Sequence, residues 1–534
     1  GGGGGGGGGA SAAALPAPLR ELEARSADAA LCLAGGGMRA AAHALGYLRA
    51  LHSAGLLARV RYVCSNSGGS WVATPALYQT QVSASTFFGP ERAPAELELA
   101  RCREDARQDG GAAKVLADAN FLRQFFLETA KDALAMDFLR GKDRVKIRAW
   151  SDAVGDCFLA AHGLGDHGAA FAVRGEPAAR ARRETGAELC YEWPGSLGDT
   201  APFPVAVGAV QPKGDPLHSH PLEFTPMYCG VPTPLDLGEG RSLGGNLVEP
   251  FGLNAAAPGA ASLVGGEQGA PLEVTLQAKW TVPLTQAVGI SSAYVAQTQV
   301  DSAREGLWEA AGCDELHLWS GTDPTYGQET PVGDGGGCDN LAVYAALRRG
   351  VRKLLIFYNF YRDPATFKSA EEFAASYYDI SGLFGACPET PAYFPGSVEE
   401  FNRHQHTFET AEFLGLFEEL KQLSEKKEPV LARRTLRVLP CPDMGVRGGF
   451  EADVLFLGAC CAAGWHDELP FETRAHILEK INAPLQEEGE GHALPFIPTN
   501  QLDYDPETVS LVSHLAAWTV KRNRDAIKAV LEDA

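Results

Sequence analysis

The sequence is poor in the features that mark membrane-spanning, nucleic-acid-binding and metal-binding proteins. Its longest apolar stretch, from Val454 to Trp465, is far shorter than the roughly 20 residues needed to cross a bilayer. Basic side chains number 46 against 67 acidic ones, so the net charge of −21 opposes a nucleic-acid partner and electrostatic recruitment to anionic membranes. Neither H-E-x-x-H nor C-x-x-C occurs, and the 13 histidines show no metal-ligand spacing. We therefore expect no transmembrane segment, no nucleic-acid partner, no metal and no cofactor.

The start of the chain lacks both a methionine and a secretory signal, which needs a basic start and an apolar core. Nine glycines and an alanine-rich stretch stand there instead, and we predict a flexible tail over residues 1–27. The 12 cysteines are unevenly spaced, and Cys32 and Cys64 lie in expected buried strands, where a free thiol behaves as a small apolar group. We expect a cytoplasmic protein, peripheral where it meets a membrane. The missing methionine leaves secretion open, and the sequence leaves the oligomeric state open.

Strand-like and helix-like segments alternate along the 534 residues, which predicts an α/β fold built in layers. Short apolar segments are expected to form strands at 31–34, 62–64, 205–210, 316–319, 354–357, 436–439 and 454–457. Helices are expected at 39–53, from 68 to about 80, through most of 95–165, and at 510–531. Residues 166–275 are rich in glycine and proline and are expected to be mostly loops over short strands.

An apolar stripe at helical spacing occurs within 95–165. Its members are Phe121, Leu122, Phe125, Phe126 and Leu134. Such a stripe is typical of a helix that packs on the core, and it also fits a lid that faces lipid.

A glycine-rich turn, Gly35-Gly36-Gly37, follows the first expected strand and opens a helix. Its sequence fits the dinucleotide fingerprint G-x-G-x-x-A, but that motif also requires an acidic residue about 20 positions later. Residues 56–64 contain none, which argues against a nucleotide. A glycine-lined turn can instead offer backbone N–H groups to a developing negative charge. A purely structural tight connection is the alternative.

A second turn, from Ser65 to Ser70, follows the next expected strand. A nucleophile elbow has the pattern G-x-S-x-G, because the sharp turn crowds its flanks. Only Ser67 is followed two positions later by glycine, Gly69, while Ser65 replaces the first glycine of the pattern. Ser67 is therefore the predicted nucleophile, and a turn that merely caps the following helix is the alternative.

These two turns, followed at a distance by Asp334-Gly335-Gly336, resemble the patatin-like phospholipases. The similarity is closest to the catalytic domain of the cytosolic (group IV) phospholipase A2 and lysophospholipase branch, and Glu223 to Pro226 resembles another segment of that branch. The resemblance implies a three-layer fold with a central mixed sheet and helical cap insertions. It implies one domain over 28–534, with core elements at 28–95 and 200–360, a cap at about 95–165 and a C-terminal extension at about 361–534.

The resemblance also implies a site. Ser67 and Asp334 would form a catalytic dyad, and Gly36 and Gly37, with Gly35 shaping the turn, would form the oxyanion hole. Arg39 would support the oxyanion or the substrate phosphate, and a structural salt bridge is its alternative role. A free aspartate has a pKa of about 3.9 and is a weak base. Because burial raises that pKa, the dyad requires Asp334 to be shielded from water.

The function that the resemblance implies is a lipid acyl hydrolase. It would release fatty acid from phospholipids or lysophospholipids through an acyl-enzyme on Ser67. Two alternatives remain, a non-phospholipid esterase or transacylase on the same fold and a catalytically silent lipid-binding relative. The intact Ser67, Asp334 and glycine turn argue against the silent relative.

Overall fold

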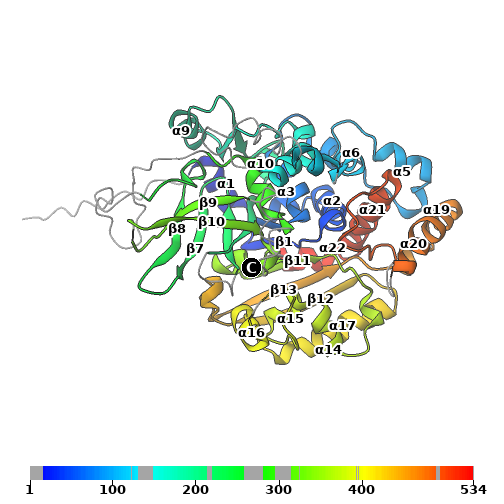
Figure 1. The fold of residues 1–534 in the computed structure, drawn as a ribbon. Coiled ribbons are helices and arrows are strands. Elements are labelled where there is room, and N and C mark those ends of the chain that lie inside the picture. The colour runs from blue at the N-terminus through cyan, green and yellow to red at the C-terminus, as the bar shows by residue number, and fades with distance from the viewer. Residues whose placement is uncertain are drawn as a thin grey trace, which may run out of the picture.

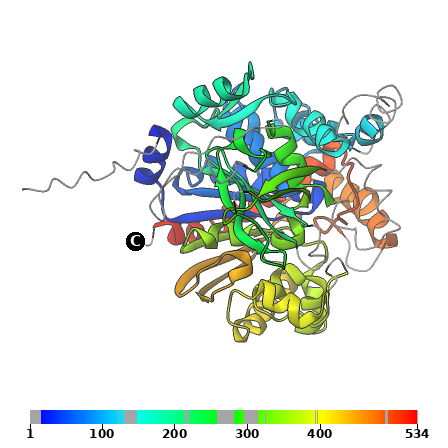
Figure 2. The same ribbon diagram turned by 60° about the vertical axis from the view of Figure 1, so that its left-hand side comes forward.

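A computed structural model describes residues 16–532 except 122, 130–147, 213–218, 258–280, 295–313, 324, 393, 395 and 489–492. Eleven strands form one mixed sheet, and helices cover both of its faces (Figures 1 and 2). The fold is therefore α/β with a central mixed sheet, as the alternation of strand-like and helix-like segments predicted.

Five parallel strands form the middle of the sheet, in the order β13-β11-β1-β2-β5. They are β1 (Ala29–Leu33), β2 (Tyr62–Asn66), β5 (Phe203–Val210), β11 (Lys353–Tyr358) and β13 (Phe450–Gly458). Every residue of β1 and β5 is buried, because a parallel sheet with helices on both faces needs apolar strands throughout. The expected strands match these five, with ends that differ by a few residues.

Antiparallel strands extend the sheet on both sides. The strand β12 (Val430–Val438) pairs with β13, and β6 (His220–Phe224) pairs with β5. Next to β6 lie β7 (Cys229–Asp236) and β8 (Ser242–Val248), and the last residues of β5 also pair with β10 (Gly327–Asp334), which pairs with β9 (Glu315–Trp319). The strand expected at 205–210 lies within β5, but the expectation of mostly loops elsewhere in 166–275 is wrong for β6–β8. The prolines and glycines of β7 and β8 are accommodated near the sheet edge and at an irregularity in their pairing.

The helices divide between the two faces of the sheet. The helices α2 (Gly37–Ser53), α3 (Gly68–Tyr78) and α21 (Pro506–Arg522) pack together on one face, while α17 (Ala411–Glu425) packs on β12 (Figure 1). Other described helices include α10 (Leu284–Ser291), α12 (Gly336–Asp339), α13 (Val343–Arg348), α15 (Tyr378–Leu383) and α22 (Arg524–Glu532).

The two ends of the chain differ from the sequence expectations. Residues 17–25 of the predicted flexible tail form α1 (Ala17–Arg25), whose Leu19 and Leu22 are buried; residues 1–15 lie outside the described part. At the other end, the single helix expected at 510–531 is two helices, α21 and α22, which are separated at Asn523.

The apolar stripe divides between core and surface. Phe121 is fully buried and stacks on Trp71 of α3, with ring centroids 5.9 Å apart, as a core residue does. Phe126 is 67% exposed. Leu122 and Leu134 lie outside the described residues. In the part of the chain that the structure describes, no helix has both the length and the apolar character required to cross a membrane.

Candidate active site

Two strands that are distant in the sequence end at the same place on β5. The strand β2 runs parallel to β5 and its pairing ends with Asn66 opposite Val207. The strand β10 runs antiparallel to β5 and its pairing ends with Asp334 opposite Gly208. The carboxyl ends of β2 and β10 therefore meet along one strand, and this register brings the residue after β2, Ser67, to Asp334.

Ser67 occupies a sharp turn between β2 and α3. Its backbone angles, φ 49° and ψ −129°, are rare for a residue with a side chain and indicate local strain. The next residue must be glycine, because a Cβ atom on Gly68 would overlap the carbonyl oxygen of Gly37. The Ser67 N–H donates a hydrogen bond to the carbonyl of Ser291, at the end of α10, over 3.0 Å. The turn thus has the geometry of a nucleophile elbow and is held from outside by α10.

Asp334 is buried and is bonded to the turn. Its side chain is 3% exposed and accepts a hydrogen bond from the Ser67 hydroxyl. Its Oδ1 atom also accepts hydrogen bonds from the Gly336 N–H at 2.7 Å and from Asn66 Nδ2 at 3.3 Å. Burial raises the pKa of Asp334 to about 6, although these three donors oppose the rise. The carboxylate is therefore a stronger base than an aspartate in water.

The glycine turn lies beside Ser67. A Cβ atom on Gly35 would be 3.0 Å from the Cβ atom of Ser67, and Gly36 and Gly37 have φ values of 131° and 59° that side chains disfavour. Gly37 is the first residue of α2, where a helix leaves its N–H groups without internal partners. Among the described residues, the N–H groups of Gly36 and Gly37 meet no acceptor. The Gly35 N–H, in contrast, donates to the carbonyl of Asn340 over 2.9 Å, so Gly35 has no open donor.

Arg39 is buried next to the glycine turn. A Cβ atom on Gly36 would be 2.8 Å from one of its terminal nitrogens. The guanidinium donates to the carbonyl of Asn359 over 3.2 Å, to the Thr499 hydroxyl over 2.9 Å and to the carbonyl of Ile497. Its hydrogen-bond partners among the described residues are neutral oxygens, so it brings an unneutralised positive charge to this turn.

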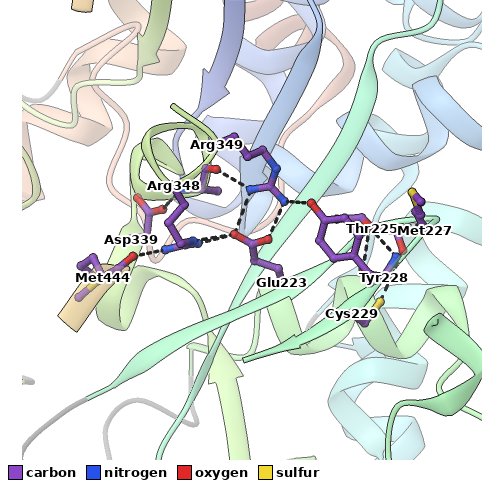
Figure 3. A network of polar contacts seen from close by, with 10 residues as sticks. Glu223, Thr225, Met227, Tyr228, Cys229, Asp339, Arg348, Arg349 and Met444 are labelled. Atoms are coloured by element: carbon purple, nitrogen blue, oxygen red, sulfur yellow. Dashed lines mark hydrogen bonds and ion pairs between the residues drawn. The ribbon is translucent and has the colours of Figure 1, made fainter. Parts of the chain in front are cut away.

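A buried cluster of charges anchors the segment that follows Asp334 (Figure 3). Glu223 of β6 is 2% exposed and pairs with Arg348 and Arg349 at the end of α13. Arg349 also bonds to the Tyr228 hydroxyl, and Arg348 donates to the carbonyl of Met444 over 2.8 Å. Because α13 follows α12 and Asp334 in the chain, these ion pairs fix the C-terminal end of that segment to the sheet.

Asp339 supports the same segment from within. Its carboxylate accepts hydrogen bonds from the Val343 N–H at 2.8 Å and the Ala345 N–H at 3.3 Å, at the start of α13. Burial raises its pKa to about 7, while the positive charge of Arg348 opposes the rise. Asp339 thus serves as the helix cap of α13.

The sequence motifs miss several residues that hold this site. Asn66 lies inside the elbow motif, where the pattern allows any residue. Ser291 lies in residues 286–293, a segment that resembles the same family but carries no assigned role, and Thr499 belongs to no motif. Within the described part of the chain, no group of three or more His, Cys, Asp or Glu side chains is arranged to hold a metal ion.

The sequence matches no protein-family model and no curated protein. Among solved structures, the chain is similar to human GIVD cytosolic phospholipase A2, with 14% sequence identity and a TM-score of 0.48; the match covers 96% of this chain and 64% of that one. It is also similar to the same human enzyme in complex with methyl gamma-linolenyl fluorophosphonate inhibitor and terbium chloride, with 14% identity, a TM-score of 0.45 and coverage of 96% and 61%. The chain therefore spans less than two thirds of the length of these structures.

Proposed function

We propose that the protein is a serine hydrolase of the patatin-like, cytosolic phospholipase A2 type that cleaves acyl esters of phospholipids or lysophospholipids. One observation carries the proposal. A serine on a strained elbow is hydrogen-bonded to a buried carboxylate whose pKa is raised to about 6, next to two backbone N–H groups that lack acceptors in the described chain. These are the nucleophile, the base and the oxyanion donors that acyl transfer requires.

The first half of the reaction forms an acyl-enzyme. The Asp334 carboxylate accepts the proton of the Ser67 hydroxyl, and Oγ attacks the ester carbonyl carbon. The π electrons of the carbonyl move to its oxygen, and the N–H groups of Gly36 and Gly37 stabilise the resulting oxyanion. The positive charge of Arg39 supports the same oxyanion or a nearby substrate phosphate. When the oxyanion collapses, the C–O bond to the alcohol breaks and the departing alkoxide takes the proton from Asp334.

The second half consumes water. Asp334 accepts a proton from a water molecule as its oxygen attacks the acyl carbon, and the oxyanion forms again at the same donors. Collapse then breaks the bond between the acyl carbon and Ser67 Oγ, and Oγ regains the proton from Asp334. A fatty acid leaves and the dyad is restored. If an alcohol replaces water in this step, the same residues carry out transacylation.

Exposed aromatic side chains in segments that contact Asp334 or the elbow helix support an apolar substrate. Tyr294 is 61% exposed and follows Ala293, whose carbonyl accepts the N–H of Asp334 over 3.4 Å. Phe126 is 67% exposed, in the segment whose Phe121 stacks on Trp71 of the elbow helix. The net charge of −21 favours neutral or zwitterionic lipid over anionic lipid.

The test is fatty-acid release from mixed phospholipid and lysophospholipid micelles. We expect activity in the wild type, loss of it in Ser67→Ala and Asp334→Ala, and retention in the exposed-site controls Ser85→Ala and Asp323→Ala. Activity that survives Ser67→Ala refutes the nucleophile. Acyl transfer to an added alcohol without fatty-acid release identifies a transacylase. Absence of activity in the wild type, with Ser67 unreactive toward a fluorophosphonate, supports the silent relative.

A further inference from the structure

We infer that Asn66 is a positioning residue that holds one oxygen of Asp334, so that the other oxygen takes the proton of Ser67. This inference rests on the dyad of the proposed function and extends it to residues to which the motifs assign no role. Asn66 is the last residue of β2, and its side chain is fully buried. Its Nδ2 atom donates to Asp334 Oδ1 over 3.3 Å and to Asn340 Oδ1 over 3.2 Å.

The orientation of the Asn66 amide is imposed from the far side of Asn340. Asp379 of α15 accepts a hydrogen bond from Asn340 Nδ2 over 2.7 Å; burial raises the pKa of Asp379, and the hydrogen bonds from Asn340 and Tyr358 oppose that rise. The Asn340 amide must then point its oxygen toward Asn66, and the NH₂ group of Asn66 must donate a hydrogen bond to that oxygen. The Tyr358 hydroxyl, 3.2 and 3.1 Å from the two oxygens of Asp379, holds the end of this chain. Asp379 therefore determines, through two amides, which end of Asn66 faces Asp334.

The hydrogen bonds at Asp334 are unequal between its two oxygens. Oδ1 accepts from both Asn66 Nδ2 and the Gly336 N–H, the latter over 2.7 Å, and these two donors fill the lone-pair directions of one carboxylate oxygen. The proton of Ser67 is then received by Oδ2. Because Oδ1 is held at two points, the carboxylate cannot rotate away from the nucleophile.

This orientation of the Asn66 amide is unfavourable for its own side-chain oxygen. Oδ1 of Asn66 is buried and has no hydrogen-bond partner among the described residues, which is unfavourable. A flipped amide would set that oxygen against the Asp334 carboxylate and lose both donated bonds. The backbone next to Asn66 leaves room for this oxygen because residue 335 is glycine: a Cβ atom on Gly335 would lie 2.5 Å from the Asn66 oxygen. An unpaired atom in the site is thus the consequence of directing the NH₂ group at Asp334.

Other titratable groups near Asp334 do not compete with this effect. Tyr378 and Cys338 face it, and burial raises the pKa of each above its ordinary value, so both are neutral near pH 6. Asp379 is linked to Asp334 through the two amides, and burial raises its pKa as well. Loss of the Asn66 donor should therefore appear as a rise in the pKa of Asp334.

The experiment compares Asn66→Leu, which keeps the volume and removes the donor, with Asp379→Asn, which replaces one acceptor oxygen with an NH₂ donor so that residue 379 no longer fixes the orientation of the amides. The control is Asn402→Leu, since the side chain of Asn402 bonds only to the backbone of Cys387 among the described residues. The rate at which a fluorophosphonate probe labels Ser67 is measured from about pH 5 to 9, beside kcat/KM for ester hydrolysis.

We expect the acid limb of the labelling profile to move upward by about one pH unit in Asn66→Leu and by less in Asp379→Asn, with the control unchanged. Rates at pH 6 should fall more than rates at the alkaline plateau. An unmoved limb with uniformly lower rates in both variants overturns the inference, and if Asn66→Leu does not fold, Asp379→Asn alone decides. Labelling without hydrolysis of any lipid ester refutes the substrate of the proposed function but leaves this test intact. Absence of labelling in the wild type overturns both.

Discussion

The charge on Glu223 should contribute a measurable part of the folding free energy. Glu223→Gln keeps the shape of the side chain but removes the charge that Arg348 and Arg349 face. Burial alone would raise the pKa of Glu223, but the two guanidiniums lower it to about 2, from 4.5 in an unfolded chain. At 1.36 kcal/mol per unit, the ionised form is stabilised on folding by about 3 kcal/mol.

The dependence on pH follows from the sign of that change. Because the folded-state pKa is depressed, the stabilisation is complete above pH 4.5 and is lost as the pH falls through about 2. Urea unfolding followed by tryptophan fluorescence should therefore separate wild type and Glu223→Gln by about 3 kcal/mol at pH 7. The separation should narrow as both proteins are measured in increasingly acidic buffer.

The matched control is an exposed ion pair. Glu176 and Arg183 have side chains that are 75% and 59% exposed, and Glu176→Gln should change stability by less than about 0.5 kcal/mol. A loss below about 1 kcal/mol in Glu223→Gln at neutral pH would refute the reasoning, because the desolvation of three charges would then cancel their attraction. A loss that does not change with pH would refute it as well.

Three further outcomes concern the candidate active site. Ester hydrolysis by the wild type should rise with pH through about 6 and then level off, because only ionised Asp334 accepts the proton; a midpoint of kcat/KM near 4 would contradict this. Asp334→Asn should abolish hydrolysis and yet raise the free energy of unfolding at pH 7 by up to about 3 kcal/mol, measured by urea unfolding. The reason is that the pKa of Asp334 is raised in the folded state, so its ionised carboxylate destabilises the fold above pH 6. This gain in stability should vanish below about pH 4. Gly68→Ala should lose activity at least a hundredfold in the micelle assay, because the new methyl group would overlap the Gly37 carbonyl and move a proposed oxyanion donor. The control Gly415→Ala should retain full activity, because the nearest atom to its added Cβ atom would be 3.9 Å away.

The sequence predicts those parts of the protein that are determined by local patterns. A short apolar strand, a run of small residues and a helix are close together in the chain, so the turns at Gly35–Gly37 and at Ser67 could be located from spacing alone. Asp334 could be named only because the resemblance supplied its order along the chain. Its burial, which raises its pKa, depends on strands that pair across more than a hundred residues, and no local pattern reports that.

The supporting contacts could not be predicted for the same reason. Glu223 contacts Arg348 and Arg349 across 125 and 126 positions, and no local pattern connects residues that far apart. Ser291 holds Ser67 through a backbone carbonyl, which any residue type could provide. At the N-terminus, composition favoured a flexible tail, but the buried Leu19 and Leu22 give 17–25 enough apolar contact to form a helix.

The meeting of β2 and β10 on β5 has a consequence for how this protein can change in evolution. Asn66 and Asp334 are 268 positions apart, yet neighbouring residues of a single strand, Val207 and Gly208, determine their separation. Segments between these strands can therefore lengthen, shorten or be exchanged without moving Ser67, the proposed nucleophile, relative to Asp334, its proposed base. An insertion of one residue between Val207 and Gly208 would separate the two, even though neither partner was altered. Variation in the intervening segments is thus uncoupled from the distance between Ser67 and Asp334, and the sensitive position lies on β5, which supplies neither residue.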